Sequence, residues 1–256
     1  MKKVVIIGNG NMAFAIAQGL VNSYKLEIVG RNLENLEEFK QRLTSTKNVT
    51  VSSIDNFSIK DETVILSTKP NNLDDVSKKV TGEAEVIYSV LAGTSIKSLR
   101  DKLDSRNYVR TMPNLSALYQ ASMTTLTGDI EYRDRAIELF SYIGEALWLE
   151  TENELDIATA IAGSGPAYLS LIAEALADGG VYAGLKRTES EKVVQGLFAG
   201  FPSLLNSAKP SLIKDGVMSP KGTTAYGYKA LEDGQVRSSM MSAIEKAYRR
   251  AVELRG

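Results

Sequence analysis

A glycine-rich segment near the start of the chain has residue types and spacing suited to binding a phosphate-containing cofactor. The letters GNGNMA, residues 8–13, directly follow the apolar residues 4–7 and open a helical pattern. In the pattern G-x-G-x-x-A between a strand and a helix, Gly8 permits a tight turn and Gly10 lets the backbone approach a pyrophosphate. The small Ala13 lets the helix pack on the strand, and the amides at the helix N-terminus would receive the phosphate. The alternative is a tight turn that binds nothing.

The end of the second predicted strand should discriminate between the two nicotinamide dinucleotides. A carboxylate there would bind the ribose 2'-hydroxyl of NAD(H), whereas an arginine would accept the 2'-phosphate of NADP(H). The segment reads Gly30-Arg31-Asn32, and no acid occurs before Glu34. The sequence therefore favours NADPH as the cofactor, with NADH as the alternative. The competing interpretation is that Arg31 only faces solvent at a strand end.

Three further loops follow predicted strands. Ser67, Thr68, Lys69 and Pro70 end one apolar strand, Ala92 and Gly93 end the next, and VRTMPNLSA, residues 109–117, forms the third such loop. Open α/β sheets bind ligands at the carboxyl ends of their strands, so these loops are candidate walls of a ligand site. Taken alone, a Lys-Pro pair indicates a structural turn equally well.

Composition limits the chemistry that is available. The chain has 256 residues, 43% of them apolar, a formal net charge of -1, no cysteine and no histidine. This excludes disulfides, thiolate nucleophiles and histidine general bases, and it removes the commonest metal ligands, so we expect no metal site. The near-balanced charge favours neither nucleic acid nor a membrane as a partner. The apolar residues near the N-terminus are too few for a signal peptide, which predicts a cytoplasmic protein.

The pattern of residue types along the sequence changes near Glu150. Before it, short β-branched runs alternate with helical patterns, and the uniformly apolar runs are typical of a parallel sheet covered on both faces. The predicted strands are residues 4–7, 26–29, 49–51, 64–67, 86–90 and 108–111, with SMTTLT (122–127) and ALWLE (146–150) as possible additions. The fold class is therefore α/β, with a Rossmann-type dinucleotide-binding domain at residues 1–152 and an all-helical domain at 153–256.

Three helices are expected in the second part. PAYLSLIAEALADGG, residues 166–180, places Leu169, Ile172, Ala173 and Leu176 on one helical face. TESEKVVQGLFAG, residues 188–200, has the letters of a capping box at its first and fourth positions. The last helix is predicted for residues 235–254.

In these motifs, taken together, the chain resembles the pyrroline-5-carboxylate reductases over nearly its whole length. The family's motifs are matched by Met12-Ala13 of the glycine segment, Thr68-Lys69-Pro70, Ala92-Gly93, Arg110-Thr111-Met112-Pro113-Asn114, Gly163-Ser164-Gly165-Pro166-Ala167-Tyr168, and DGVMSPKGTTAYGYKALEDG at residues 215–234. The resemblance implies an NAD(P)H-dependent oxidoreductase that reduces a cyclic imine to L-proline in proline biosynthesis. It also implies a helical domain that dimerises, often in a ring of five dimers.

The resemblance implies particular site residues as well. The substrate carboxylate would be received by backbone amides and hydroxyls where SPKGTT opens a helix, and Thr224 would relay a proton as the catalytic hydroxyl. Ordinary helix capping is the alternative role for this segment. The implied substrate-binding residues are Ser219, Lys221, Gly222, Thr223, Thr224, Ser164, Gly165 and Pro166. The implied cofactor-binding residues are Ile7, Gly8, Asn9, Gly10, Asn11, Met12, Arg31, Asn56, Ser67, Thr68, Lys69, Pro70, Ala92 and Gly93.

Some positions depart from the family pattern. Lys221 stands where a glycine is usual, Ser207 lies about where some members carry a glutamate, and Gly196 replaces a threonine. A tyrosine-containing stretch, residues 225–228, replaces a more aliphatic one. Two rival interpretations remain: a β-hydroxyacid dehydrogenase relative, which would carry a catalytic lysine on a helix of the second domain, and a nucleotide-sensing protein without catalytic activity.

Overall fold

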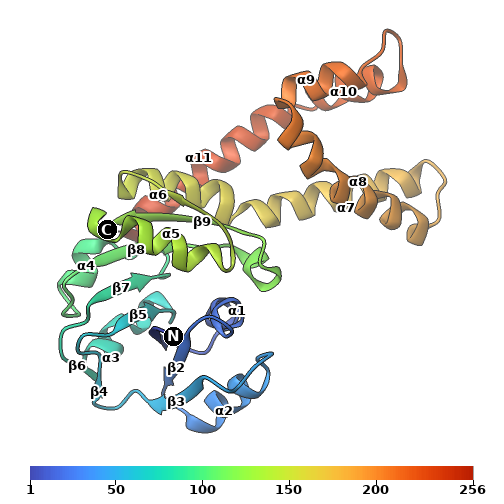
Figure 1. Cartoon of the computed structure of the whole chain (residues 1–256). Helices are drawn as coiled ribbons and strands as arrows, with labels where there is room; N and C mark the ends of the chain where they lie inside the picture. The colour runs from blue at the N-terminus through green and yellow to red at the C-terminus, as the bar shows by residue number, and fades with distance from the viewer. Residues whose placement is uncertain (256) are drawn as a thin grey trace. The chain divides into compact units, whose positions relative to one another are not determined.

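The computed structural model describes residues 1–255 and divides the chain into two compact units (Figure 1). The first unit comprises Met1–Ser164 together with the end of the chain from Lys246 onward, and the second comprises Gly165–Glu245. The domain boundary predicted at residue 152 follows the change from strands to helices. Packing instead groups the first helical turns after that point, and the last turns of the chain, with the sheet.

The first unit is built on an eight-stranded sheet with the strand order β10-β9-β8-β7-β5-β1-β2-β3. All six predicted strands are confirmed, and both possible additions are strands as well. Only the β8–β9 pair is antiparallel, so β9 and β10 run opposite to the other six strands. The strands are β1 (Lys3–Ile7), β2 (Lys25–Gly30), β3 (Val49–Ser53), β5 (Thr63–Leu66), β7 (Val86–Ser89), β8 (Tyr108–Met112), β9 (Ser122–Gly128) and β10 (Gly144–Trp148). The short strands β4 (Phe57–Ser58) and β6 (Val80–Thr81) form a second, parallel pair.

Apolar side chains lie on both faces of the sheet, as the uniform strand composition predicts. Val4 and Ile6 of β1 belong to one buried cluster, and Val5 and Ile7 belong to the other. A strand alternates its side chains between faces, so a strand covered on both sides is apolar at nearly every position. Between the strands lie the helices α1 (Asn11–Leu20), α2 (Leu33–Gln41), α3 (Leu73–Ser77), α4 (Ile96–Arg100) and α5 (Arg133–Ser141), with the short turns η1 (Pro70–Asn72), η2 (Leu115–Tyr119) and η3 (Ile130–Tyr132).

A continuous helix, Glu152–Tyr182, carries the chain from the first unit into the second. It consists of α6 (Glu152–Ala158), the π-helical turn η4 (Thr159–Gly163) and α7 (Gly165–Tyr182). Its start is fixed by a capping box, in which Thr151 accepts from the Glu154 amide and the Glu154 carboxylate accepts from the Thr151 amide. The capping box predicted at residues 188–191 is wrong: the helix begins one residue earlier, after the extended Lys186, and no side chain caps it. Thr188 is therefore already inside the helix, where its side chain cannot cap.

The second unit contains α7, α8 (Arg187–Ser207), α9 (Pro210–Val217), α10 (Thr223–Asp233) and the first half of α11 (Val236–Arg255). The strongest packing inside it joins α7 to α8, where the Ser190 hydroxyl donates to the Ala177 carbonyl at 2.7 Å. The predicted apolar face of α7 is largely uncovered within one chain, since Leu169 is 53% and Leu176 is 45% exposed.

The helix Glu152–Tyr182 is also, by length and composition alone, apolar enough to cross a membrane. Its mean hydropathy is 1.3 over its most apolar stretch, and 17% of that stretch is buried. Such a test is weak evidence of a membrane span, because large obligate subunit interfaces are apolar in the same way.

Candidate active site

The glycine segment forms the turn between β1 and α1, and its two glycines are required for different reasons. Gly8 has a φ of +124°, and a Cβ on it would lie 2.2 Å from the Ser67 carbonyl oxygen, so the protein's own packing demands glycine there. A Cβ on Gly10 would meet no protein atom within 4 Å. The space above Gly10 is therefore open, as close approach by a ligand requires.

The amides at the start of α1 have no side-chain partner. Gly10 is the N-cap residue in an extended conformation, and no side chain caps the helix. Free amides and the positive end of a helix dipole attract phosphate oxygens. The turn is thus suited to a pyrophosphate, and it satisfies the strand-to-helix context that the motif needs.

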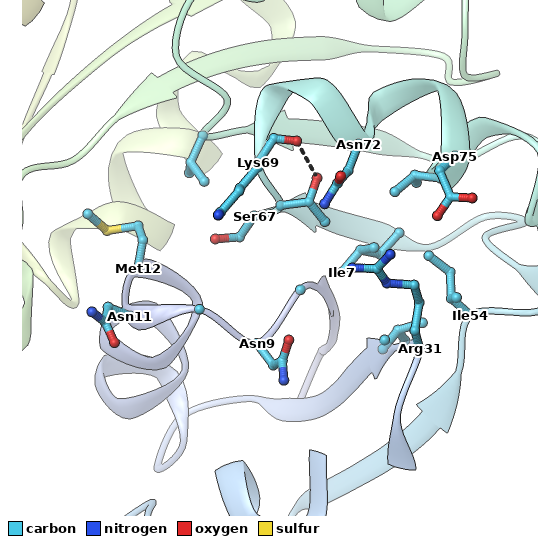
Figure 2. A pocket seen from close by; sticks show the side chains of 17 residues that line it. Ile7, Asn9, Asn11, Met12, Arg31, Ile54, Ser67, Lys69, Asn72 and Asp75 are labelled. Atoms are coloured by element: carbon cyan, nitrogen blue, oxygen red, sulfur yellow. Dashed lines mark hydrogen bonds between the residues drawn. The ribbon is translucent and has the colours of Figure 1, made fainter. Parts of the chain in front are cut away.

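A cavity of about 540 Å³ lies over this turn (Figure 2). Of the predicted cofactor residues, those lining it are Ile7, Gly8, Asn9, Gly10, Asn11, Met12, Arg31, Ser67, Thr68 and Lys69. Asn56, Pro70, Ala92 and Gly93 are not among the lining residues. The sequence-based search missed seven others that do line it: Val29, Gly30, Ile54, Asn72, Asp75, Val76 and Val90. Most of these are apolar residues at strand ends or on α3, which look like ordinary core residues in a sequence.

Arg31 and Asp75 bring opposite charges to the same part of the cavity wall (Figure 2). Within the described residues Arg31 is exposed and forms no ion pair, so its guanidinium is available to an anion. Asp75 lies 3.9 Å from Lys79, which partly neutralises it. The neighbouring Asn32 has a structural task, because its side chain accepts from the Asn35 amide and caps α2.

The loop after β7 is held by the end of the chain. Gly93 has a φ of +66°, and a Cβ on it would lie 2.6 Å from Cβ of Leu254 in α11. Arg110, on β8, is fully buried and pairs with Glu152 and Asp156 of α6. The loop after β7 and strand β8 itself are therefore both tied to helices that come much later in the sequence.

Ser164, Gly165 and Pro166 lie within the long helix, directly after its π-helical turn. Proline has no amide hydrogen, so Pro166 cannot donate to the Ala162 carbonyl as an α-helix would require. The Asn114 side-chain amide donates to that carbonyl instead, at 3.0 Å. π-helical turns are frequent at functional sites, and this one is stabilised by Asn114 of the third predicted loop, residues 109–117. The first four residues of that predicted loop, 109–112, are part of strand β8.

SPKGTT forms a turn and the first residues of α10. The Gly222 amide donates to the Ser219 carbonyl at 3.0 Å, and Gly222 is the N-cap residue without side-chain capping. A Cβ on Gly222 would lie 2.3 Å from the Ser219 hydroxyl oxygen. Among the described residues, the hydroxyls of Ser219, Thr223 and Thr224 make no hydrogen bond, so ordinary capping does not occupy them.

Lys221 adopts a φ of +59°, in the left-handed region. The backbone therefore has a positive φ at this position, which favours the family's usual glycine, even though a lysine occupies it here. Of the other departures, Ser207 closes α8 by donating to the Leu204 carbonyl at 2.8 Å. A Cβ on Gly196 would meet open space. The Tyr228 hydroxyl accepts from Arg237 at 2.6 Å.

Two family models match the chain, one in its helical part and one in its N-terminal part. The family model for pyrroline-5-carboxylate reductase dimerisation matches residues 152–254, and that for NADP oxidoreductase, coenzyme F420-dependent, matches residues 3–93. Pyrroline-5-carboxylate reductases from Helicobacter pylori and Synechocystis are 33% and 34% identical to the chain. The alignments cover 98% and 97% of this chain and 99% and 97% of the relatives.

Solved structures give the same result. The 1-pyrroline-5-carboxylate reductase of Streptococcus pyogenes aligns with a TM-score of 0.84 at 31% identity, over 98% of each chain. The Plasmodium falciparum pyrroline carboxylate reductase, solved with NADP bound, aligns with a TM-score of 0.78 at 25% identity, over 99% of this chain and all of that one. Similarity of sequence and fold over the full length, with dinucleotide-binding and dimerisation regions in the same order, means that this chain belongs to the pyrroline-5-carboxylate reductase family of NAD(P)H-dependent oxidoreductases.

Proposed function

We propose that this protein reduces the C=N bond of 1-pyrroline-5-carboxylate to give L-proline, the last step of proline biosynthesis, with NADPH as the preferred reductant. The observation that carries the proposal is the open space over Gly10, beside the free amides of α1, in a chain that is similar to these reductases from end to end.

The cavity in the first unit fits the cofactor. The amides at Gly10, Asn11 and Met12 would bind the pyrophosphate, and the free guanidinium of Arg31 would pair with the 2'-phosphate of NADPH. NADH would lack that ion pair and is the weaker cofactor in this proposal. Asn56, Pro70, Ala92 and Gly93, which do not line the cavity, remain proposed contacts implied by the family. When bound, the cofactor supplies the hydride.

The unused hydroxyls of SPKGTT support the proposed substrate site. The amides at the start of α10 and the hydroxyls of Ser219 and Thr223 would bind the substrate carboxylate, with the Lys221 ammonium adding charge from the turn. Thr224 would relay a proton to the imine nitrogen while carbon accepts the hydride. A hydroxyl has a high intrinsic pKa, so it acts here as a hydrogen-bonded relay and not as a free acid. Ser164, Gly165 and Pro166 would form a second wall for the substrate.

The helical unit exposes apolar side chains that dimerisation would cover, which agrees with the matched dimerisation family. A ring of five dimers and a cytoplasmic location extend this proposal.

The decisive experiment follows the absorbance of reduced nicotinamide, with and without 1-pyrroline-5-carboxylate, and identifies the product. NADPH oxidation that depends on the imine and yields proline is expected. Tight NADPH binding without turnover would contradict the proposal and favour the nucleotide-sensing interpretation.

A variant separates chemistry from folding. Thr224→Ala should lower kcat/KM for the imine by about 100-fold or more while the NADPH dissociation constant stays unchanged. Thr188→Ala, which removes an exposed hydroxyl from α8, is the matched control and should leave both quantities unchanged. Equal loss of substrate turnover and NADPH binding in Thr224→Ala would mean that the start of α10 serves folding.

A further inference from the structure

Four charged side chains from three distant parts of the sequence meet inside the first unit. Arg110 lies 2.9 Å from the Glu152 carboxylate and 3.1 Å from Oδ1 of Asp156. Arg255, in the last turn of α11, lies 2.9 Å from Oδ2 of the same aspartate. The group therefore runs from β8 through the start of α6 to the end of the chain.

The cluster is buried and electrically neutral. The side chains of Arg110 and Asp156 are each 2% exposed, and those of Arg255 and Glu152 are 21% and 28% exposed. Two arginines balance two acids. Desolvation offsets much of the attraction in such a group, so a buried ionic cluster adds little stability over apolar residues of the same shape. Its physical benefit is that it fixes one arrangement of the elements that supply its members.

The same cluster fixes the loop after β7. Oε1 of Glu152, which accepts from Arg110, also accepts from the Ile96 amide at 2.9 Å. At the other end of the loop, Gly93 fits only because it has no side chain against Leu254, the neighbour of Arg255. The loop is thus held between the first turn of α6 and the last turn of α11.

This loop starts at the cavity. Val90 lines the cavity over the glycine turn, and the following residues lead directly to Gly93 and Ile96. A displacement of the last turn of α11 would therefore be transmitted over a few residues of backbone to the cavity wall.

We propose that Arg255 is a positioning residue for the cofactor: through Asp156, Arg110 and Glu152 it locks the loop at residues 91–96, and with it the cavity wall at Val90. The inference rests on the proposed function, because the cavity must hold NADPH for the lock to affect it. It assigns a role to the last turn of α11, whose residues are not among those that line the cavity.

The test compares Arg255→Met with Arg250→Met in the full-length protein. Arg250 lies in the same helix but is exposed, and within residues 1–255 it pairs locally, with Glu253 at 2.8 Å, so it is the matched control. Amide hydrogen exchange at residues 91–96 reports the lock directly, without a cofactor. NADPH titration and the KM for NADPH report its consequence.

Arg255→Met should speed exchange at residues 91–96 and raise the dissociation constant for NADPH, each by about fivefold or more, while Arg250→Met changes neither. Arg255→Lys, which keeps the charge, should recover part of both. Unchanged exchange in Arg255→Met would overturn the lock. Faster exchange with unchanged NADPH affinity would overturn the positioning role. Wild-type protein that does not bind NADPH would instead refute the proposed function, and the exchange comparison would still decide the lock.

Discussion

Replacing Lys221 by glycine should make this protein more stable, because the backbone at that position is in a conformation that L-residues avoid. Lys221 has a φ of +59° in the turn that precedes α10. The left-handed conformation costs an L-residue about 1–2 kcal/mol, since its Cβ approaches the following carbonyl oxygen. Glycine has no such cost.

The gain is reduced by the entropy of glycine in the unfolded chain. That term opposes folding by about 0.5–1 kcal/mol. The difference leaves Lys221→Gly more stable by about 0.5–1 kcal/mol, which corresponds to a rise in Tm of about 2 °C for a chain of this size. Protein concentration must be held constant, because subunit association contributes to the apparent stability.

Two controls separate the backbone from the charge. Lys221→Ala removes the ammonium but keeps a Cβ, so its stability should equal that of the wild type. Gln235→Gly relieves another positive φ, +56°, at the turn between α10 and α11, and should also raise Tm. Thermal unfolding and urea titration measure all three variants.

Kinetics give the second readout. If the ammonium assists the substrate carboxylate, both Lys221 variants should raise the KM for the imine by about two- to fivefold, the range expected of an exposed ion pair. Stability and KM would then change independently. Equal stability of Lys221→Gly and Lys221→Ala would refute the reasoning from backbone strain.

Three further predictions concern the first unit. Gly10→Ala should leave Tm unchanged, since its Cβ meets no protein atom, yet weaken NADPH binding in a fluorescence titration. Gly8→Ala, whose Cβ collides with backbone, should lower both Tm and NADPH affinity. Equal behaviour of the two variants would contradict the separate roles assigned to the two glycines. Arg31→Ala should raise the KM for NADPH more than that for NADH, and unchanged selectivity would show that Arg31 only faces solvent. Burial acts to raise the pKa of Glu27, but the hydrogen bonds from Lys3 and Ser52 outweigh this effect, so the pKa of Glu27 lies below its ordinary value. The resulting stability is present above the unfolded pKa of about 4.3 and is lost as pH falls through the folded pKa. Lys3→Met should therefore cost more stability near neutral pH than in acid, by urea unfolding at both, and an equal cost would refute the coupling.

Much of the first unit could be predicted because its signals are local. A strand covered on both faces is apolar at nearly every position, and residues 4–7 of β1, 64–66 of β5 and 86–88 of β7 have that composition. The glycine turn combines Gly8 and Gly10 within three residues, so its spacing can be recognised without knowing any distant contact. The start of α10 inside SPKGTT was predictable for the same reason.

Prediction from local sequence failed where two segments have the same capping-box pattern. Thr188 and Thr151 each begin a pattern that a capping box can use, but only Thr151 occupies the N-cap position of its helix. Which one caps depends on where the preceding chain leaves its extended conformation, and packing of the whole helix decides this.

The sequence by itself determined the α/β class, the phosphate-binding turn and the helical second part, because backbone conformation and side-chain periodicity depend on near neighbours. Tertiary structure alone decided that Ser67 forbids a side chain at Gly8, that Leu254 does so at Gly93, and that Arg110 is neutralised by Glu152 and Asp156. These partners are far apart along the chain, and no local pattern records them. Steric overlap excludes a side chain at the two glycines, and burial in a low-dielectric interior makes a partner obligatory for the Arg110 charge.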